Sequence, residues 1–300
     1  MQKLGFFLIG VLIVFFSRVS AAELAGTGGT LRLGVPNDIA VLNPFMRTAS
    51  INHNVRALLF EPLLTHGDSG PRPYLAESWK ISADGTEYEF RIKAGIRFHD
   101  GTELSCEDIK WSIDYALDPK NGAYGRPNLG MIQSVDCASA RNLRIKLKEQ
   151  TASFLSLAAT IQSFPLVPKA SLKPGELPSS FPPGTGPFML AEWKPGQSLV
   201  LQRYKDYWQK GMPKVEQVMM RVISDDSVRL TALRTGEVDV IDSMSHQYVD
   251  RIRKREIKDV NLVYANGTGF RGLIFNVRKP PLDSAKSARR SPMRSTRRSF

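Results

Sequence analysis

Strand-like and helix-like segments alternate along this chain, and the alternation limits its fold more than any other feature. Residues 30–35 (TLRLGV) alternate in polarity and end at a Pro-Asn turn, a pattern typical of a β-strand. Apolar residues then recur at helical spacing over residues 53–64. Residues 79–81 and 88–92 follow as the two arms of a hairpin with an Asp-Gly between them. Interleaved helices and strands predict an α/β or mixed α+β fold.

The same alternation continues to the last third of the chain. Ser105 can cap a helix and Asp108 stands three residues later, which resembles a capping box. Leu143, Ile145 and Leu147 alternate with basic residues, so a strand with one exposed face is expected. Further strands are expected at 199–201, 218–222, 238–241 and 273–275, and a loop at 173–187. One helix is expected to be capped by Asp226 or Ser227 and to run through Val228, Leu230 and Leu233 to Gly236. Another is expected at 246–255.

The net charge of +12 is concentrated at the two ends of the chain. With 300 residues, 42% of them apolar, the chain can form about two domains with a sizeable core. Residues 1–22 carry +2 and residues 284–300 carry +6, which leaves an ordinary +4 for residues 23–283. The basic residues of the C-terminal stretch are Lys286, Arg289, Arg290, Arg294, Arg297 and Arg298.

The N-terminus has the pattern of a secretory signal peptide. Lys3 precedes an apolar run from Leu4 to Phe16, and Ser20-Ala21-Ala22 supplies small residues at cleavage spacing. A run of 13 apolar residues is short for a bilayer, which needs about 20. We therefore expect cleavage near Ala22, export, and a soluble mature protein.

Motifs for catalysis, metal binding or phosphate binding are not found. The four histidines are scattered, and no HExxH, CxxC, G-x-S-x-G or Walker-type loop occurs. The sequence thus predicts no enzyme, no metal site and no cofactor. Cys106 and Cys137 can form one disulfide in an oxidising compartment or remain two free thiols, and their spacing does not decide between these states.

Residues 73–119 (PYLAESWKISADGTEYEFRIKAGIRFHDGTELSCEDIKWSIDYALDP) closely resemble the extracellular solute-binding proteins of peptide-type ABC importers. Four more blocks are similar to this family in the same order: 31–45, 184–209, 232–242 and 275–283. The resemblance covers residues 30–283. It implies a periplasmic monomer that binds a peptide and delivers it to an ABC permease in the inner membrane, with no nucleic acid involved.

The resemblance also implies a clamshell of two lobes that closes on its ligand. Residues 23–58 and 175–268 would form the first lobe, residues 59–174 a small extra domain, and residues 269–283 the start of the second lobe. Similarity to the family assigns ligand contacts to two segments. The residues are Leu42, Asn43, Pro44 and Phe45 in the first, and Gly267, Thr268, Gly269 and Phe270 in the second.

Other functions are possible for this sequence. The cargo can be nickel or an oligosaccharide, which other members of the family bind. The basic C-terminal stretch can bind nucleic acid or an anionic membrane, and such binding would be lost above moderate salt. An exported hydrolase is a third class, although the chain lacks a recognisable nucleophile and base.

Residues 284–300 replace the helix that the family has after the block at 275–283. Residues 286–296 can be encoded by several sets of codons. One permitted set, translated in the frame that starts two bases later, encodes VREAIAYAID, which fits the family pattern for this helix. The sequence therefore suggests a frameshift near residues 283–287, an out-of-frame tail and a missing second lobe.

Overall fold

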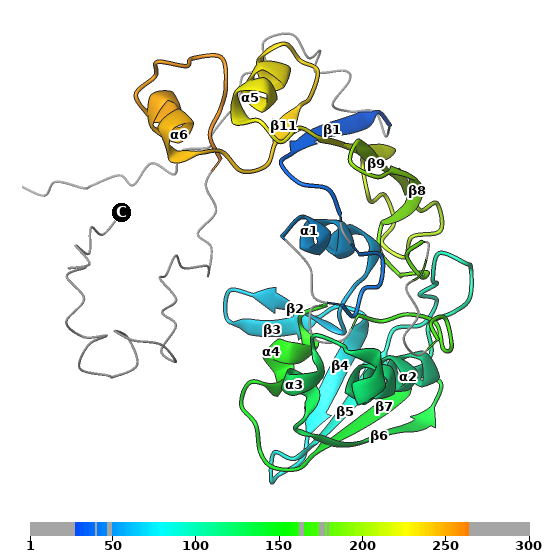
Figure 1. Cartoon of the computed structure of the whole chain (residues 1–300). Helices are drawn as coiled ribbons and strands as arrows, with labels where there is room; N and C mark the ends of the chain where they lie inside the picture. Colours follow the sequence, from blue (N-terminus) through cyan, green and yellow to red (C-terminus); the bar gives the residue numbers. More distant parts are fainter. Residues whose placement is uncertain are drawn as a thin grey trace, which may run out of the picture. The chain divides into compact units, whose positions relative to one another are not determined.

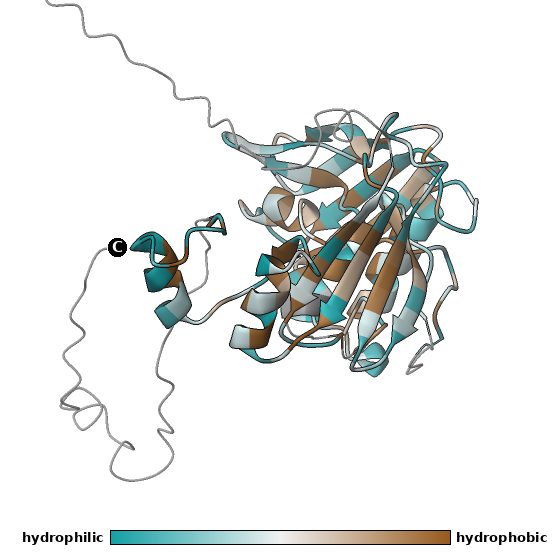
Figure 2. Cartoon of the chain, turned by 90° about the horizontal axis from the view of Figure 1, so that it is seen from above, coloured by the Kyte–Doolittle hydropathy of each residue, from teal (hydrophilic) through white to brown (hydrophobic). Residues whose placement is uncertain are grey.

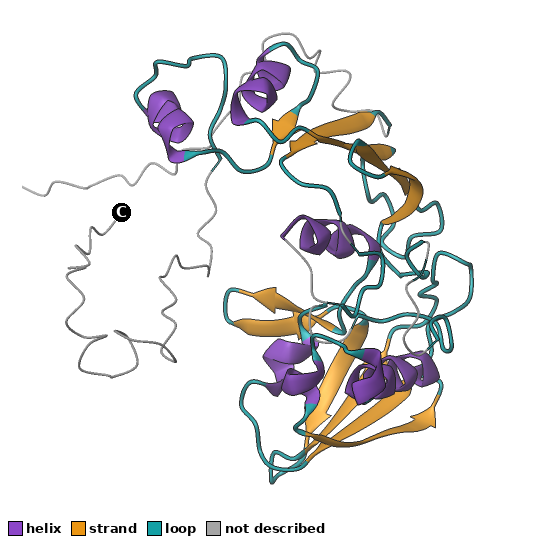
Figure 3. Cartoon of the chain, in the orientation of Figure 1, coloured by secondary structure: helices purple, strands orange, loops and turns teal. Residues whose placement is uncertain are grey.

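The structure is a computed structural model that describes residues 28–39, 41–46, 50–161, 165–173, 178 and 180–263. Their elements are shown in Figure 1 and by type in Figure 3. In chain order they are β1 (Thr30–Val35), α1 (Ser50–Leu59), β2 (Leu64–Gly67), β3 (Gly70–Pro73), β4 (Ala76–Ile81), β5 (Glu87–Ile92), α2 (Cys106–Leu117), the 3-10 helix η1 (Pro119–Asn121), α3 (Arg126–Leu129), β6 (Ile132–Ser139), β7 (Asn142–Leu147), α4 (Phe154–Ala158), β8 (Phe188–Lys194), β9 (Ser198–Arg203), β10 (Gln217–Val222), α5 (Asp226–Arg234), β11 (Val240–Ile241) and α6 (His246–Arg253).

A five-stranded sheet joins the start of the described chain to its last third, in the order β11-β1-β10-β9-β8. Strand β1 lies between β10 and β11 and is parallel to both, whereas β9 is antiparallel to β10 and to β8. The pairing of β1 with β10 joins Thr30 to Gln217, and the side chains of these two residues also share a hydrogen bond. This sheet therefore depends on contacts between segments that are far apart in sequence.

A four-stranded antiparallel sheet, in the order β4-β5-β7-β6, is built from one continuous stretch. On β5 and β7 buried and exposed residues alternate strictly, as hydrophobic and hydrophilic residues do along strands in Figure 2. The buried face packs against α2 and α4, where the ring of Phe154 lies 4.6 Å from that of Tyr88. Buried side chains from both sheets belong to one hydrophobic core.

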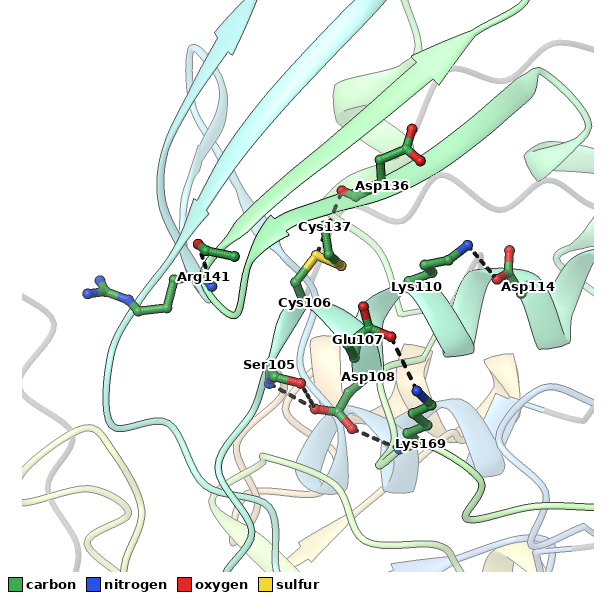
Figure 4. The surroundings of a disulfide bond; sticks show 11 residues. Ser105, Cys106, Glu107, Asp108, Lys110, Asp114, Asp136, Cys137, Arg141 and Lys169 are labelled. Carbon is green, nitrogen blue, oxygen red and sulfur yellow. Dashed lines mark hydrogen bonds and ion pairs between the residues drawn. A yellow bond between two sulfur atoms is a disulfide. The ribbon is translucent and has the colours of Figure 1, made fainter.

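A disulfide fastens α2 to the four-stranded sheet (Figure 4). Cys106 opens the helix and Cys137 lies on β6, and their Cα atoms are 5.8 Å apart. In the same turn of α2, the Asp108 carboxylate accepts hydrogen bonds from the backbone N–H and the hydroxyl of Ser105, at 2.8 and 2.6 Å. This half of the predicted capping box is formed, and the two cysteines, whose state the sequence left open, are bonded.

The two sheets meet at a junction where glycines allow main chain to touch main chain. A Cβ placed on Gly184 would lie 2.0 Å from the carbonyl oxygen of Leu59, at the end of α1. His99 completes the junction, because its Nδ1 accepts the N–H of Gly184 at 3.2 Å and its Nε2–H donates to the carbonyl of Gly186 at 3.0 Å. The Tyr204 hydroxyl donates to the carbonyl of Phe98 at 2.7 Å.

Several expected elements have different limits in the structure. Helix α1 ends at Leu59 and not at residue 64, because Leu64 begins the β2–β3 hairpin that the pattern did not predict. The cap of α5 is Asp225, one residue before the predicted pair, and its carboxylate accepts the N–H groups of Ser227 and Val228. Strand β11 covers only Val240–Ile241, and α6 ends at Arg253.

The expected strand at 273–275, the segment at 267–270, the N-terminal apolar run and the basic tail all lie outside the described residues. Within the described ranges, none of the helices has the length and apolar character needed to cross a bilayer. The boundaries proposed for the lobes and the extra domain stay predictions.

Candidate functional site

Strands β1 and β10 are parallel neighbours, but the segments that follow them lead towards opposite ends of the five-stranded sheet. After β10 the chain forms α5, which contacts β1 and β11, and it returns as β11 beyond β1. After β1 it forms α1, which contacts β8 at the other end of the sheet. In open α/β sheets, ligands bind outside the carboxyl ends of the strands where the direction reverses in this way. The fold thus selects the carboxyl ends of β1, β10 and β11 as the candidate site.

We call this site the carboxyl edge and define it by its loops. Hydrogen bonds join them: Ile223 N–H donates to the carbonyl of Val35 at 2.8 Å, and Asp242 N–H donates to that of Gly34 at 3.0 Å. The turn between β8 and β9 joins the same edge, because Val222 N–H donates to the carbonyl of Gln197 at 2.9 Å. The carboxyl edge comprises residues 36–39, 41–46, 195–197, 223–225 and 242–245.

Asp38 holds the loop after β1 against the turn between β8 and β9. Its Oδ1 accepts hydrogen bonds from the N–H of Ile39 at 2.8 Å and from Nε1–H of Trp193 at 3.2 Å. Its Oδ2 accepts the N–H of Gly196 at 2.5 Å. Hydrogen bonds to a carboxylate are stronger than those between neutral groups, so this loop is well fixed at its start.

Arg229, on α5, holds the loop after β10 against the loop after β11. Its Nη1 donates to the carbonyls of Ile223 and Ser224, at 2.6 and 3.2 Å. Its Nη2 donates to the carbonyl of Ser243 at 2.8 Å and pairs with Asp226. The stem of Arg229 passes close to Gly34, where a Cβ would lie 3.2 Å from its Cγ.

Carboxylates at the start of α5 are ionised at neutral pH. A hydrogen bond from the N–H of Ser245 lowers the pKa of Asp226, and one from the side chain of Ser227 lowers the pKa of Asp225. Asp225 satisfies the first N–H groups of α5, so this helix start is already occupied by its own cap. Asp226 instead supplies the negative charge that accompanies buried Arg229.

The four predicted ligand residues that fall in the described chain, Leu42, Asn43, Pro44 and Phe45, are buried. The exposed fractions of Leu42, Asn43 and Phe45 are 5%, 0% and 3%. Asn43 Oδ1 accepts the N–H of Phe45 at 3.0 Å, and the ring of Phe45 lies 4.8 Å from that of Tyr115 on α2. These side chains hold the loop in place from inside, and a ligand contact by this segment would have to use its main chain. Their role in binding stays a prediction.

The second predicted ligand segment, with Gly267, Thr268, Gly269 and Phe270, lies outside the described residues, and its role in binding stays a prediction.

A buried carboxylate at the junction of the sheets was not singled out from the sequence. Glu61 accepts hydrogen bonds from the Tyr207 and Tyr74 hydroxyls at 2.6 and 2.9 Å and from Trp208 Nε1–H at 2.9 Å. Burial raises the pKa of Glu61, and burial beside this carboxylate raises the pKa of Tyr74 to about 12. These groups fix the loop between β9 and β10.

Two surface hollows lie elsewhere. One, of about 690 Å³, is lined by residues that include Lys93, Arg97, Lys205, Trp208 and Lys210. The other, of about 260 Å³, lies on the outer face of the four-stranded sheet. Neither includes a residue of the carboxyl edge. Among the described residues, no cluster of three or more His, Cys, Asp or Glu side chains could hold a metal ion.

Comparison with known proteins places these features in context. The family model described as "Bacterial extracellular solute-binding proteins, family 5 Middle" matches residues 70–290. The glutathione-binding protein GsiB of Escherichia coli K12 is 24% identical over 278 residues, which are 92% of this chain and 54% of that protein.

Two solved structures are similar in fold. AgaA from A. tumefaciens R10, in complex with agropinic acid, has a TM-score of 0.68 at 29% identity and covers 75% of this chain and 46% of its own. The ABC transporter-associated periplasmic binding protein DppA from Helicobacter pylori, in complex with peptide STSA, has a TM-score of 0.69 at 25% identity, with 78% and 50% covered. The chain thus spans about half the length of the proteins it matches.

Proposed function

Because the chain belongs to the bacterial extracellular solute-binding proteins of family 5, we propose that it acts as the substrate-binding component of an ABC importer. The observation that carries this proposal is the carboxyl edge: a reversal point between parallel strands whose loops are fixed from behind by Asp38 and Arg229. A preformed surface of this kind suits reversible binding. The family is one of solute-binding proteins, and no enzymatic activity is proposed.

The proposed cargo is a peptide. The buried side chains of Leu42, Asn43 and Phe45 leave the main chain of this segment for contact, and extended peptides are commonly recognised through main-chain hydrogen bonds, as in strand addition. The names of the similar proteins support a small peptide-like solute, since they include a glutathione-binding protein and a complex with a peptide. Nickel and oligosaccharides are the alternative cargoes.

The proposed place of action is the periplasm. The signal sequence would be cleaved near Ala22, and the mature monomer would deliver its cargo to a permease in the inner membrane. We also infer that the reading frame shifts near residues 283–287, and the nucleotide sequence of the gene tests this. The inference fails if the shifted reading frame does not continue as a long open frame that encodes a second solute-binding lobe.

The binding proposal is tested by calorimetry and thermal shift with glutathione, di- to nonapeptides, Ni²⁺ with histidine, and an oligosaccharide. Two proteins are compared, the 300-residue chain and the product of the gene with its frame restored. We expect micromolar or tighter peptide binding by the second and weak or no binding by the first, because closure around a ligand needs two lobes. Binding of Ni²⁺ or oligosaccharide alone would favour the alternatives, and no binding to any solute would overturn the proposal.

A further inference from the structure

Helix α5 buries a charged residue next to a position that its pattern predicts to be buried. The sequence predicts Val228 on the apolar face of this helix, but its side chain is 56% exposed, whereas Arg229 is 1% exposed. Helix α5 contacts β1 and β11. Arg229 therefore lies between this helix and the two strands that lead into the carboxyl edge. An arginine is almost never fully buried unless its charge is paired.

Besides its ion pair with Asp226, Arg229 makes most of its contacts with main chain. Three of its hydrogen-bond acceptors are carbonyls, two in the loop after β10 and one in the loop after β11. A guanidinium can make these bonds together because its donors lie in a rigid planar fork, while a lysine ammonium is a single point. The side chain therefore sets the separation of two loops that no strand pairing joins directly.

Asp226 extends this arrangement to the start of α6. One carboxylate oxygen pairs with Arg229, and the other accepts the N–H of Ser245 at 2.9 Å. In the loop after β11, Ser243 has a φ of 58°, in the left-handed region that residues other than glycine seldom occupy. Its carbonyl is the one that Arg229 binds, so the charged pair holds this unusual backbone conformation in place.

Stability alone does not account for Arg229. Removing a charged group from water costs several kcal/mol, and a buried ion pair often contributes little net stability. Within the described residues, the buried Nε of Arg229 also has no hydrogen-bond partner, and such an unsatisfied donor costs free energy. The hydrogen bonds of Arg229 do join the two loops to one another.

We propose that Arg229 is a positioning residue for cargo binding: it fixes residues 223–225 and 242–245 in one relative position, so that the main chain of the carboxyl edge is preformed for the solute. The inference rests on the proposed function, because only a ligand at this edge gives the arrangement a purpose. Preformed loops lose little conformational entropy on binding, and loosening them weakens affinity without removing any direct contact.

The test compares Arg229→Met and Arg229→Lys with Arg234→Met. Arg234 is a matched control, because it lies on the same helix and makes an exposed ion pair with Asp259. Amide hydrogen exchange is measured on the 300-residue chain. We expect exchange at residues 223–226 and 242–245 to rise at least tenfold in both Arg229 variants, with β5 and β7 unchanged. Full protection at the edge in Arg229→Lys would show that charge or bulk is enough, and would overturn the proposal.

Cargo affinity supplies the second measurement, in whichever form of the protein binds a solute in the titrations above. We expect Arg229→Lys to lose at least tenfold in affinity and Arg234→Met less than twofold. Unchanged affinity together with loosened loops would contradict the positioning role. If Arg229→Met does not fold, Arg229→Lys and Asp226→Asn decide by the same two measurements. If no form binds any solute, the proposed function fails, while hydrogen exchange still decides whether Arg229 fixes the loops.

Discussion

The two sheets reach the same kind of core by different routes. The four-stranded sheet is assembled from one continuous stretch, residues 76–147, with antiparallel neighbours and exposed ion pairs on its outer face. The five-stranded sheet places β1 beside β10, and the pair Thr30 and Gln217 is 187 residues apart. Local pairing closes short loops, whereas distant pairing must close a long loop before its contacts can form.

Sequence patterns predicted single strands about equally well in both sheets: β6 was missed in the four-stranded sheet and β8 in the five-stranded sheet. The alternation of Leu143, Ile145 and Leu147 identified β7, and the Asp-Gly turn identified the hairpin of β4 and β5. Strand β6 was missed because its register shifts twice, so its buried residues do not alternate strictly. The β2–β3 hairpin was missed because β3 is GPRP, a composition that favours turns.

The candidate site was less predictable. The family resemblance pointed to the segment around Asn43, but no pattern indicated Asp38, Glu61 or Arg229. Each of these charged residues reads as a surface position in sequence, and only the tertiary fold surrounds it with donors or acceptors. Conversely, Val228 fits an apolar helix face and is exposed, because the neighbours of α5 lie on the side of Arg229.

The largest expected effect tests the distant contacts. Gly184→Ala would place a Cβ 2.0 Å from the carbonyl oxygen of Leu59, so one of these two backbone segments would have to shift. We expect a loss of about 4 kcal/mol or more in the free energy of unfolding, measured by urea denaturation. Gly130→Ala is the control, since its nearest contact would be an ordinary 3.5 Å. Equal stability of both variants would mean that the junction is not close-packed.

The disulfide tests the local sheet. Replacing Cys106 and Cys137 by alanine removes a link across a separation of 31 residues, and loop entropy predicts a loss of about 3.5 kcal/mol. Urea denaturation with and without dithiothreitol measures it. Reductant should lower the midpoint of the wild type to near that of the double variant, which itself should not respond. A wild type that is insensitive to reductant would indicate that the thiols are free.

The junction should also respond to pH through His99. Burial lowers the pKa of His99 below its ordinary 6.5, so the folded state binds fewer protons than the unfolded state in this range. Stability is complete above pH 6.5 and falls as the pH drops towards the lowered pKa, by at most about 1.4 kcal/mol per pH unit. His99→Gln can keep both hydrogen bonds and should show a shallower decline between pH 7 and 5.

His66→Gln, in the β2–β3 hairpin, is the control for this titration. Burial also lowers the pKa of His53, which remains in both variants, so the comparison isolates His99. A decline as steep in His99→Gln as in the wild type would assign the pH dependence to other groups.

The smallest effect is expected on the outer face of the four-stranded sheet, where Glu77 pairs with Arg91 and Arg141. All three side chains are more than one third exposed, so water and salt screen the pairs. Glu77→Gln should cost about 0.5 kcal/mol in urea denaturation at low salt, and less in 0.5 M NaCl. Arg229, in contrast, is buried and binds main chain, so its replacement should change local hydrogen exchange whether or not salt is added. A loss for Glu77→Gln as large as that of the disulfide variant would mean that the outer face, too, depends on specific polar contacts.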